Sequence, residues 1–367
     1  ESSAFNWIEK RQHQVRSENL MNRLSAYFLP FLSRSSHKER VLLRQLGNNE
    51  IAKSDKCRYI FEVLYKIDPD WDNAQTAKFY NVDGVDNTLA SLLGERLRSY
   101  DYCFLSGQLD PTAIFANSTV NPHDLQNRMF PFLKKINEES KTVMWPIITD
   151  MTTGEAVPAP EVDMESSNFN GNFWSNWNRL SKGRGFVLTI AEKDVPLFLK
   201  QLKVMESSKN ELPFQIVSTG NELSAESIAK ISETAKETEQ RVYLVDCSTV
   251  LDTNFANTYI SFFQNKWVAT LFNTFEEYIL LDADVVPFVG SDYFFDSPSY
   301  RERGILLFKD RVMENEQTFQ YCIEMLNEVE PSAQERRFIG SRLVFDSSLP
   351  FSSETSEEAS VYYNFFK

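Results

Sequence analysis

The sequence predicts an α/β fold in which a mostly parallel sheet is covered by helices on both faces and follows a mainly helical N-terminal region. In the second half of the 367-residue chain, short apolar runs alternate with helical stretches. Each run is apolar throughout, which is typical of strands buried on both faces of a parallel sheet. Before about residue 145, apolar residues recur at helical spacing instead. The chain therefore combines two regions of different architecture.

Five apolar runs are the predicted strands, and a helical stretch follows each of the first three. In chain order the runs are Gly185–Ile190, Phe214–Thr219, Val242–Asp246, Tyr278–Asp282 and Gly304–Phe308. This alternation of strands and helices favours parallel pairing of the strands.

Four regions are predicted along the chain. Residues 1–145 form a helical stem or accessory region, and residues 182–345 form the domain that holds the sheet. Between them, residues 146–181 show no periodicity and are rich in Gly, Pro, Ser, Asn and acidic residues, so we expect a linker or surface loop. Residues 346–367 form a tail.

The net charge of −14 bears on the partners of the chain. An acidic protein repels phosphate backbones, so we expect no nucleic-acid partner. No run of about eighteen apolar residues occurs, so no segment of this chain is predicted to span a membrane. The chain begins with Glu rather than Met, and no signal peptide is visible, so we expect a processed form.

The histidines and cysteines exclude several kinds of site. The last of three histidines is His123, so the second half of the chain has no base for a Ser-His-Asp or Cys-His mechanism. The four cysteines lack zinc-ligand spacing. Whether Cys57 and Cys103 pair in an oxidising compartment is left open by the sequence. Cys247 and Cys322 are predicted to be buried free thiols.

The segment EEYILLDADVVPF, Glu276–Phe288, brings two carboxylates to the end of a predicted buried strand. Because strand side chains alternate, we expect Asp282 and Asp284 to point to the same side. Carboxylates this close repel each other unless a cation lies between them, and hard oxygen ligands suit Mn²⁺ or Mg²⁺. Open α/β sheets bind ligands at the carboxyl ends of their strands, where the strand order reverses. We therefore predict a divalent metal site that holds a diphosphate donor; the alternative is a pair of solvated aspartates.

An Asp-x-Asp pattern alone is weak evidence, and the chain contains a second example. DPDWD, Asp68–Asp72, follows a helical stretch and contains Pro69. It lacks the Gly and the distal Glu of a calcium loop, so we interpret it as a turn that ends the helix.

Three basic residues are candidate donor contacts. Lys266 precedes the aspartate pair in a helical stretch, Arg311 follows the fifth predicted strand, and Arg184 lies between two glycines. We predict that all three contact the cofactor or donor phosphates, and that Asp310 acts in catalysis together with Asp284. The alternatives are a lysine that reaches solvent along the helix flank, a local ion pair between Asp310 and Arg311, and an ordinary glycine turn.

Four segments of the second half form a longer pattern, and in chain order they are GRGFVLTI, LPFQIVSTGNELS, FQNKWVATLFNTFEEYILLDADVVPF and GILLFKDR. Together they resemble the fungal α-1,3-mannosyltransferases of glycosyltransferase family 71. The resemblance implies a GT-A fold, GDP-mannose as donor, Mn²⁺ as cofactor and retention at the anomeric carbon. It also implies a type II Golgi membrane protein with its stem and anchor upstream. On this resemblance Asp282 and Asp284 match the metal motif, Lys266 matches the lysine before it, and Lys309–Arg311 matches the segment after it.

The resulting prediction is a metal-dependent retaining glycosyltransferase of the Golgi lumen. It would transfer mannose from GDP-mannose to a mannosylated glycan acceptor in an α-1,3 linkage, with the acceptor class left open. Members of the family continue well past the KDR segment, so the chain is expected to lack a C-terminal part. A non-catalytic GT-A-like subunit or an inactive fragment is therefore the first alternative. A haloacid-dehalogenase-like phosphatase is the second, because ILLDADVV also fits the opening motif of that superfamily.

Overall fold

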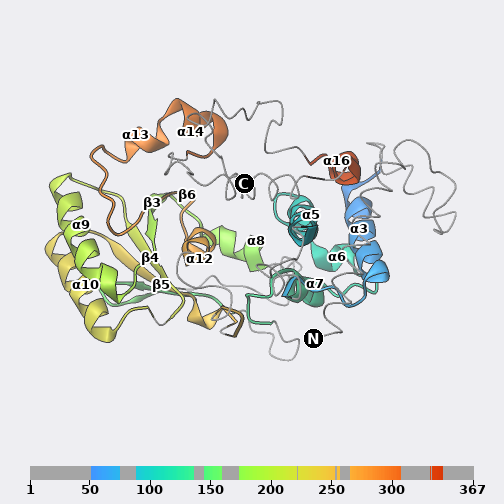
Figure 1. Cartoon of the computed structure of the whole chain (residues 1–367), viewed down its shortest axis with the longest axis horizontal. Coiled ribbons are helices and arrows are strands. Elements are labelled where there is room, and N and C mark those ends of the chain that lie inside the picture. Colours follow the sequence, from blue (N-terminus) through green and yellow to red (C-terminus); the bar gives the residue numbers. More distant parts are fainter. Residues whose placement is uncertain are drawn as a thin grey trace. The chain divides into compact units, whose positions relative to one another are not determined.

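The computed structural model describes residues 51–74, 88–135, 144–158, 173–220, 222–252, 254–256, 265–306, 331 and 333–341. The chain divides into two compact units (Figure 1). Unit 1 comprises residues 1–129 and 307–367, and unit 2 comprises residues 130–306. No helix in the described part of either unit is both long enough and apolar enough to cross a membrane.

Unit 1 is helical over its described residues, as predicted for the N-terminal region. Its helices are α3 (Lys53–Ile67), α5 (Thr88–Phe104), α6 (Pro111–Ile114), α7 (Pro122–Met129) and α16 (Ala333–Ile339). Aromatic side chains form its core, in which the Phe61 ring packs against Tyr100, Phe104 and Phe115 at centroid distances of 5.5–6.5 Å. The position of α16 differs from the prediction, which placed residues up to 345 in the domain with the sheet.

A disulfide joins α3 to α5 within this core. Cys57 and Cys103, whose pairing the sequence left open, are bonded to each other, and both are fully buried. Disulfides persist in oxidising compartments, so the bond is compatible with a location in the secretory pathway.

The DPDWD segment ends α3, which confirms the predicted turn. Asp68 is the C-cap, and its backbone N–H donates to the Leu64 carbonyl at 3.0 Å. The N–H of Trp71 then donates to the Asp68 carbonyl at 3.1 Å. The pattern of alternating aspartates is a structural turn at this position.

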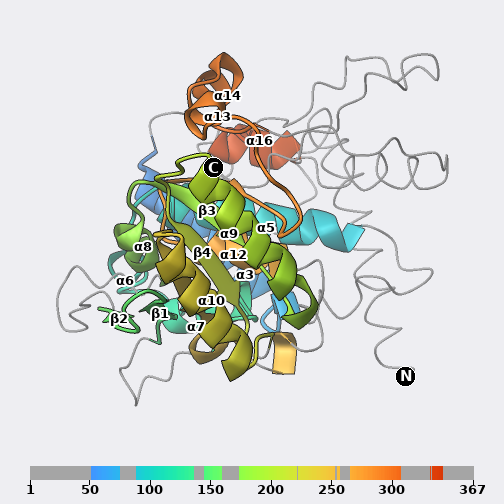
Figure 2. The same ribbon diagram turned by 90° about the vertical axis from the view of Figure 1, so that its left-hand side faces the viewer.

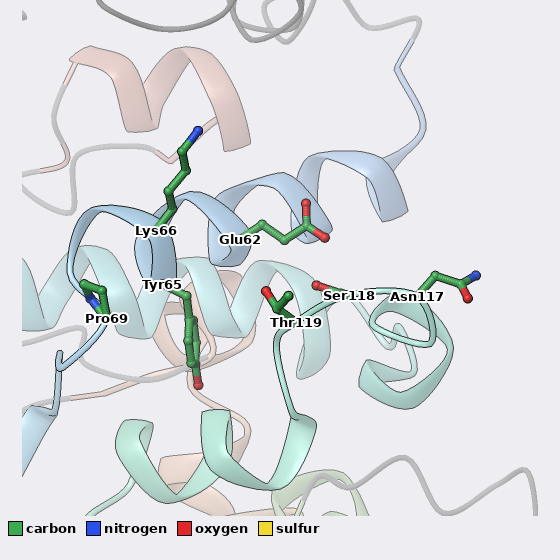
Figure 3. Close-up of a pocket in the computed structure, with 7 residues that line it drawn as sticks. All are labelled: Glu62, Tyr65, Lys66, Pro69, Asn117, Ser118 and Thr119. Carbon is green, nitrogen blue, oxygen red and sulfur yellow. The ribbon is translucent and has the colours of Figure 1, made fainter.

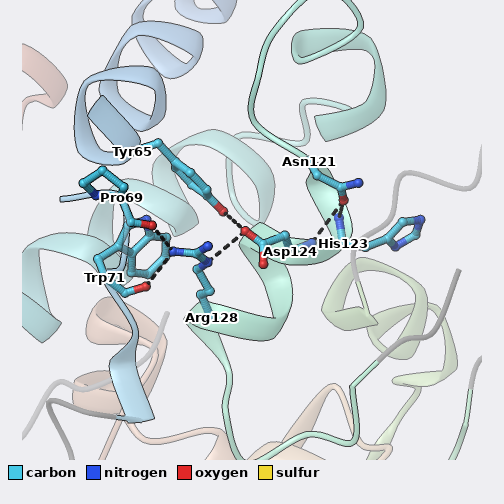
Figure 4. A network of polar contacts seen from close by, with 7 residues as sticks. All are labelled: Tyr65, Pro69, Trp71, Asn121, His123, Asp124 and Arg128. Atoms are coloured by element: carbon cyan, nitrogen blue, oxygen red, sulfur yellow. Dashed lines mark hydrogen bonds and ion pairs between the residues drawn. The ribbon is translucent and has the colours of Figure 1, made fainter. Parts of the chain in front are cut away.

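A polar network fastens the turn to α7 (Figure 4). Arg128 donates to the carbonyls of Pro69 at 2.6 Å and Trp71 at 3.1 Å, and it forms an ion pair with Asp124 at 2.8 Å. Asp124 also accepts a hydrogen bond from the Tyr65 hydroxyl at 2.8 Å. Burial and this neighbouring carboxylate raise the pKa of Tyr65, so the hydroxyl keeps its proton and remains a donor.

A buried ion pair connects α5 to α16 in unit 1. Arg98 donates to both carboxylate oxygens of Glu335, at 2.5 Å and 2.8 Å, and the Glu335 side chain is only 2% exposed. We expect Arg98→Ala to lower the free energy of unfolding by about 3 kcal/mol, because it leaves a buried carboxylate without its counter-ion. Urea unfolding followed by tryptophan fluorescence measures the loss. Adding Glu335→Gln to Arg98→Ala is expected to recover part of it, and a double variant no more stable than the single one contradicts this explanation.

Unit 2 is built on a mixed six-stranded sheet. Its strands are β1 (Ile147–Asp150), β2 (Ala156–Val157), β3 (Arg184–Leu188), β4 (Phe214–Ser218), β5 (Val242–Asp246) and β6 (Glu277–Leu280). The strand order is β2-β1-β5-β4-β3-β6. The strands β3 to β6 pair in parallel, whereas β1 is antiparallel to both of its neighbours. Four of the five predicted strands are thus observed, and the sheet gains an antiparallel edge.

The predicted linker over residues 146–181 folds into regular structure where the structure describes it. It contains β1, β2, α8 (Phe173–Trp177) and the 3-10 helix η1 (Asn178–Leu180). The turn between β1 and β2 accounts for part of the polar composition. The Asp150 carboxylate accepts from the backbone N–H of Thr152 at 2.7 Å, and Gly154 supplies a positive φ of 79°. The linker prediction was wrong here because turn residues of a short hairpin resemble those of a loop.

Helices cover both faces of the sheet, as predicted. Figures 1 and 2 show α9 (Val195–Ser207) and α10 (Ala225–Glu237) side by side on one face, and Figure 1 shows α12 (Asn265–Phe272) on the other. On the first face, the Phe214 ring packs against Phe186 at 5.1 Å and against Phe198 of α9 at 6.0 Å. On the second face, Phe272 of α12 packs against the aromatic rings of α8.

The strand order reverses beside β3. The chain passes from β3 through β4 to β5 in one direction, and β6 then pairs with the other side of β3. In open α/β sheets, the crevice at the carboxyl ends of two such strands is where ligands bind. The carboxyl ends of β3 and β6 therefore mark the expected binding position.

The fifth predicted strand, Gly304–Phe308, is not observed in its described part. After β6, the chain forms α13 (Asp292–Phe295) and α14 (Pro298–Arg303). Gly304 ends α14 in the left-handed conformation, with φ 71°, and no strand follows up to Leu306. Residues 307 and 308 lie outside the described residues.

Candidate active site

The two aspartates lie at the carboxyl end of β6, in a β-turn. β6 ends at Leu280, and the N–H of Val285 donates to the Asp282 carbonyl at 3.0 Å. Asp282 and Asp284 are both exposed to solvent. A turn rather than a strand carries the pair, so strand alternation does not set the directions of the two carboxylates, and their common direction stays a prediction. The position predicted for the pair, at the reversal of strand order, is confirmed.

Lys266 lies beside this turn. It is in the first turn of α12, and its ammonium group is 2.5 Å from Asp282 Oδ1. Both side chains remain partly exposed, at 38% for Lys266 and 48% for Asp282. The lysine thus offsets the charge of Asp282 and brings a positive charge beside the turn.

Two buried or half-buried side chains that the sequence analysis missed support the surrounding loops. Gln201 of α9 is 1% exposed and donates to the carbonyl of Asp282 at 3.1 Å and to that of Val285. In the sequence, Gln201 could have been noticed as a polar residue on the apolar face of a predicted helix. Glu222 follows β4 and lies in the segment STGNELS, whose repeated small and polar residues are typical of a closed loop.

Glu222 closes the loop at the carboxyl end of β4. Its carboxylate accepts from the backbone N–H groups of Thr219 and Gly220 at 3.0 Å, and from the Ser218 hydroxyl at 2.7 Å. Asn265, next to Lys266, donates to the same carboxylate at 3.3 Å. Partial burial alone would raise the pKa of Glu222, but the hydrogen bonds from Thr219 and Ser218 outweigh it, so the pKa is lowered.

This pKa shift predicts a contribution of Glu222 to stability that depends on pH. A carboxyl whose pKa is lower in the folded state stabilises the fold above its unfolded pKa, and the contribution is lost as the pH falls through the folded pKa. We expect Glu222→Gln to cost about 1–2 kcal/mol at pH 7, the scale of lost hydrogen bonds to a partly exposed charge. Urea unfolding of both proteins across pH 7 to pH 3 measures the difference, which should shrink below about pH 4.5. A difference that stays constant over this range contradicts the assignment.

Arg184 lies at the opposite end of the sheet from the aspartates. It is the first residue of β3 and pairs in register with Glu277, the first residue of β6. Its guanidinium bonds to the Glu277 carboxylate at 2.6 Å and lies over the Phe295 ring at 4.7 Å. Four residues of strand, about 13 Å, separate it from the carboxyl end of β3. The predicted contact of Arg184 with the donor is therefore corrected to a structural ion pair.

The remaining predicted residues, Lys309, Asp310 and Arg311, lie outside the described residues. Their assignment to the donor and to catalysis stays a prediction. The structure brings together Lys266, Asp282 and the turn that carries Asp284.

The donor set of this turn fits a divalent ion that keeps several outer ligands. Among the described residues, no group of three or more His, Cys, Asp and Glu side chains could surround a metal. The turn offers the two carboxylates of Asp282 and Asp284. Mg²⁺ is commonly bound through one or two carboxylates together with water and phosphate oxygens, so two exposed aspartates are a suitable set.

A separate cavity lies in unit 1 (Figure 3). Its volume is about 610 Å³, and it is lined by Glu62, Tyr65, Lys66, Pro69, Asn117, Ser118 and Thr119. It contains none of the predicted site residues. Its lining side chains join α3 to the loop after α6, and they do not form a cluster of catalytic groups.

Comparisons with known proteins agree on one group of enzymes. The model of a protein family described as "Mannosyltransferase putative" matches residues 183–367, half of the chain. Alpha-1,3-mannosyltransferase MNN1 of Saccharomyces cerevisiae is 23% identical over 81% of this chain and 50% of its own length. Alpha-1,3-mannosyltransferase MNT2 of the same yeast is 26% identical over 56% of this chain and 40% of its own length. The chain thus spans half or less of the length of these relatives.

Proposed function

The chain belongs to this mannosyltransferase family, and we propose that it transfers mannose from GDP-mannose to a mannosylated glycan acceptor. The proposed product is an α-1,3 linkage formed with retention at the anomeric carbon, on a GT-A fold. The observation that carries the proposal is the exposed turn of Asp282 and Asp284 at the carboxyl end of β6, beside Lys266 and at the reversal of strand order. The curated relatives, which are named α-1,3-mannosyltransferases, supply the linkage.

The roles of the residues follow from their charge and position. Asp282 and Asp284 would hold Mn²⁺ or Mg²⁺, and the bound ion would stabilise the negative charge of the departing diphosphate. Lys266, whose ammonium group lies 2.5 Å from Asp282 Oδ1, would bring a second positive charge to the donor phosphates. Asp310 and Arg311 are proposed to act at the sugar and the phosphates.

The location that fits this activity is the lumen of the Golgi, with a membrane anchor upstream of this chain. The Cys57–Cys103 disulfide supports an oxidising compartment. The acidic character of the chain requires local positive charge for an anionic donor, and the metal ion together with Lys266 would provide it.

Calorimetric titration of GDP, with Mn²⁺ and with a chelator, tests the donor site. We expect GDP to bind at least about tenfold tighter with Mn²⁺, a difference of about 1.4 kcal/mol. Incubation with GDP-mannose and an α-mannoside acceptor, with the linkage determined by NMR, then tests transfer. Equal GDP affinity with and without metal contradicts the site.

Two further outcomes distinguish the alternative functions. Metal-dependent GDP binding without sugar transfer supports a non-catalytic GT-A-like subunit or an inactive fragment. Hydrolysis of p-nitrophenyl phosphate would support the phosphatase alternative, in which Asp282 is the nucleophile and Asp284 the general acid.

A further inference from the structure

A fully buried glutamine fastens the aspartate turn to the neighbouring helix. Gln201 lies in α9 and is 1% exposed. Its amide nitrogen donates to the Asp282 carbonyl at 3.1 Å and to the Val285 carbonyl, which are the two ends of the turn. These residues are 81 and 84 positions away in the sequence, so a single side chain links distant parts of unit 2.

Apart from the two carbonyls of the turn, the surroundings of Gln201 are apolar. Its neighbours on the same face of α9 are Phe198, Leu202 and Met205, which fill the core between α9 and the sheet. Burial of an amide is unfavourable unless its polar atoms are paired, and Gln201 Oε1 is buried without a hydrogen-bond partner. The benefit of a glutamine at this position therefore lies in the two N–H donors that face the turn.

These two bonds add to the single bond within the turn. The N–H of Val285 donates to the Asp282 carbonyl, and Gln201 donates to that same carbonyl and to the carbonyl of Val285. The carboxylates of Asp282 and Asp284 themselves are exposed, so packing does little to hold them. The backbone of the turn must therefore fix where the carboxylates can meet a metal ion.

We propose that Gln201 is a positioning residue that pre-organises the turn of Asp282 and Asp284 for a divalent ion and for the diphosphate of the donor. The inference rests on the proposed function of this turn. Groups that orient metal ligands through hydrogen bonds typically change metal affinity by about 10- to 100-fold when they are removed. A similar effect is expected for Gln201, although it contacts neither the metal nor the donor.

The test uses variants that remove the donors and keep the volume. Gln201→Met and Gln201→Leu both replace the amide with apolar atoms of similar volume, so the second variant can be used if the first does not fold. Gln240→Leu is the matched control, because Gln240 is also a buried glutamine, and its amide bonds to Asn210 after α9 instead of to the turn. Thermal unfolding confirms that each variant is folded.

Two measurements then report on the turn. Hydrogen exchange of the metal-free protein is expected to be faster at residues 283–286 in the Gln201 variants and unchanged there in Gln240→Leu. The Mn²⁺ concentration for half-maximal GDP binding is expected to rise about tenfold or more in the Gln201 variants only. Excess Mn²⁺ should restore GDP binding, which distinguishes a positioning residue from a ligand such as Asp284.

Failure of the proposal differs visibly from failure of the proposed function. If the unaltered protein binds GDP without any need for Mn²⁺, the function assigned to the turn is wrong and the inference falls with it. If the unaltered protein needs Mn²⁺, but a folded Gln201 variant has the same exchange rates and a Mn²⁺ requirement within twofold, then only the positioning role is overturned.

Discussion

Replacement of Asp284 by asparagine is expected to lower the rate of mannosyl transfer about 1000-fold while the protein remains folded. Asparagine has nearly the same shape, and Asp284 is exposed, so little packing is lost. The substitution removes one of the two carboxylates of the turn, and a bound metal contributes several kcal/mol to the stabilisation of developing charge. A loss of about 4 kcal/mol corresponds to three powers of ten in rate. Initial rates with GDP-mannose at saturating Mn²⁺ measure the effect.

The control for this substitution lies in the other Asp-x-Asp pattern of the chain. Asp70 is also exposed and also alternates with a second aspartate, but it belongs to the turn that ends α3. Asp70→Asn is expected to leave the transfer rate within about twofold. A transfer rate of Asp284→Asn within tenfold of the original would show that the turn of β6 is not the metal site.

Removal of the Cys57–Cys103 disulfide is expected to lower the free energy of unfolding by about 4 kcal/mol. The bond closes a loop with a sequence separation of 46 residues, and the loop-entropy relation gives a value of this size. The double variant Cys57→Ser and Cys103→Ser avoids an unpaired thiol in the core of unit 1. Urea unfolding under non-reducing conditions measures the change.

The same bond can be tested by reduction. Dithiothreitol is expected to destabilise the original protein and to have no effect on the double variant. Cys247 is a buried cysteine outside the disulfide, so Cys247→Ala reports the cost of altering a buried sulfur alone. If dithiothreitol leaves the urea midpoint of the original protein unchanged, the bond has no stabilising role.

Much of the sheet could be predicted from the sequence, because β3, β4, β5 and β6 carry strongly apolar runs. The prediction that the strand before the aspartates is buried was wrong, since β6 is a partly exposed edge strand. The strands β1 and β2 could not, since β1 contains only two apolar residues and β2 is exposed on a hairpin whose turn residues are polar. The predicted strand that begins at Gly304 is not observed in its described part for a related reason. Gly304 ends helix α14, and composition does not distinguish a glycine that ends a helix from one that precedes a strand.

The candidate site was predictable in part. Asp282 and Lys266 come together as expected, because α12 begins at the same edge of the sheet where β6 ends. Arg184 was misplaced although it directly precedes a predicted strand. In a parallel sheet that position lies at the amino end, opposite the end that carries Asp282, and the register with Glu277 shows it there. Gln201 was missed because its role depends on contacts with a turn more than 80 residues away.

The ion pair of Arg184 and Glu277 stabilises the sheet at the end opposite to the proposed metal site. It joins the amino ends of β3 and β6, whereas both proposed metal ligands, Asp282 and Asp284, lie beyond the carboxyl end of β6. Mutations selected for heat tolerance can therefore accumulate around Arg184 without altering donor recognition. Directed evolution of the sugar preference can conversely sample the loops after β6 while this ion pair keeps the two strands paired.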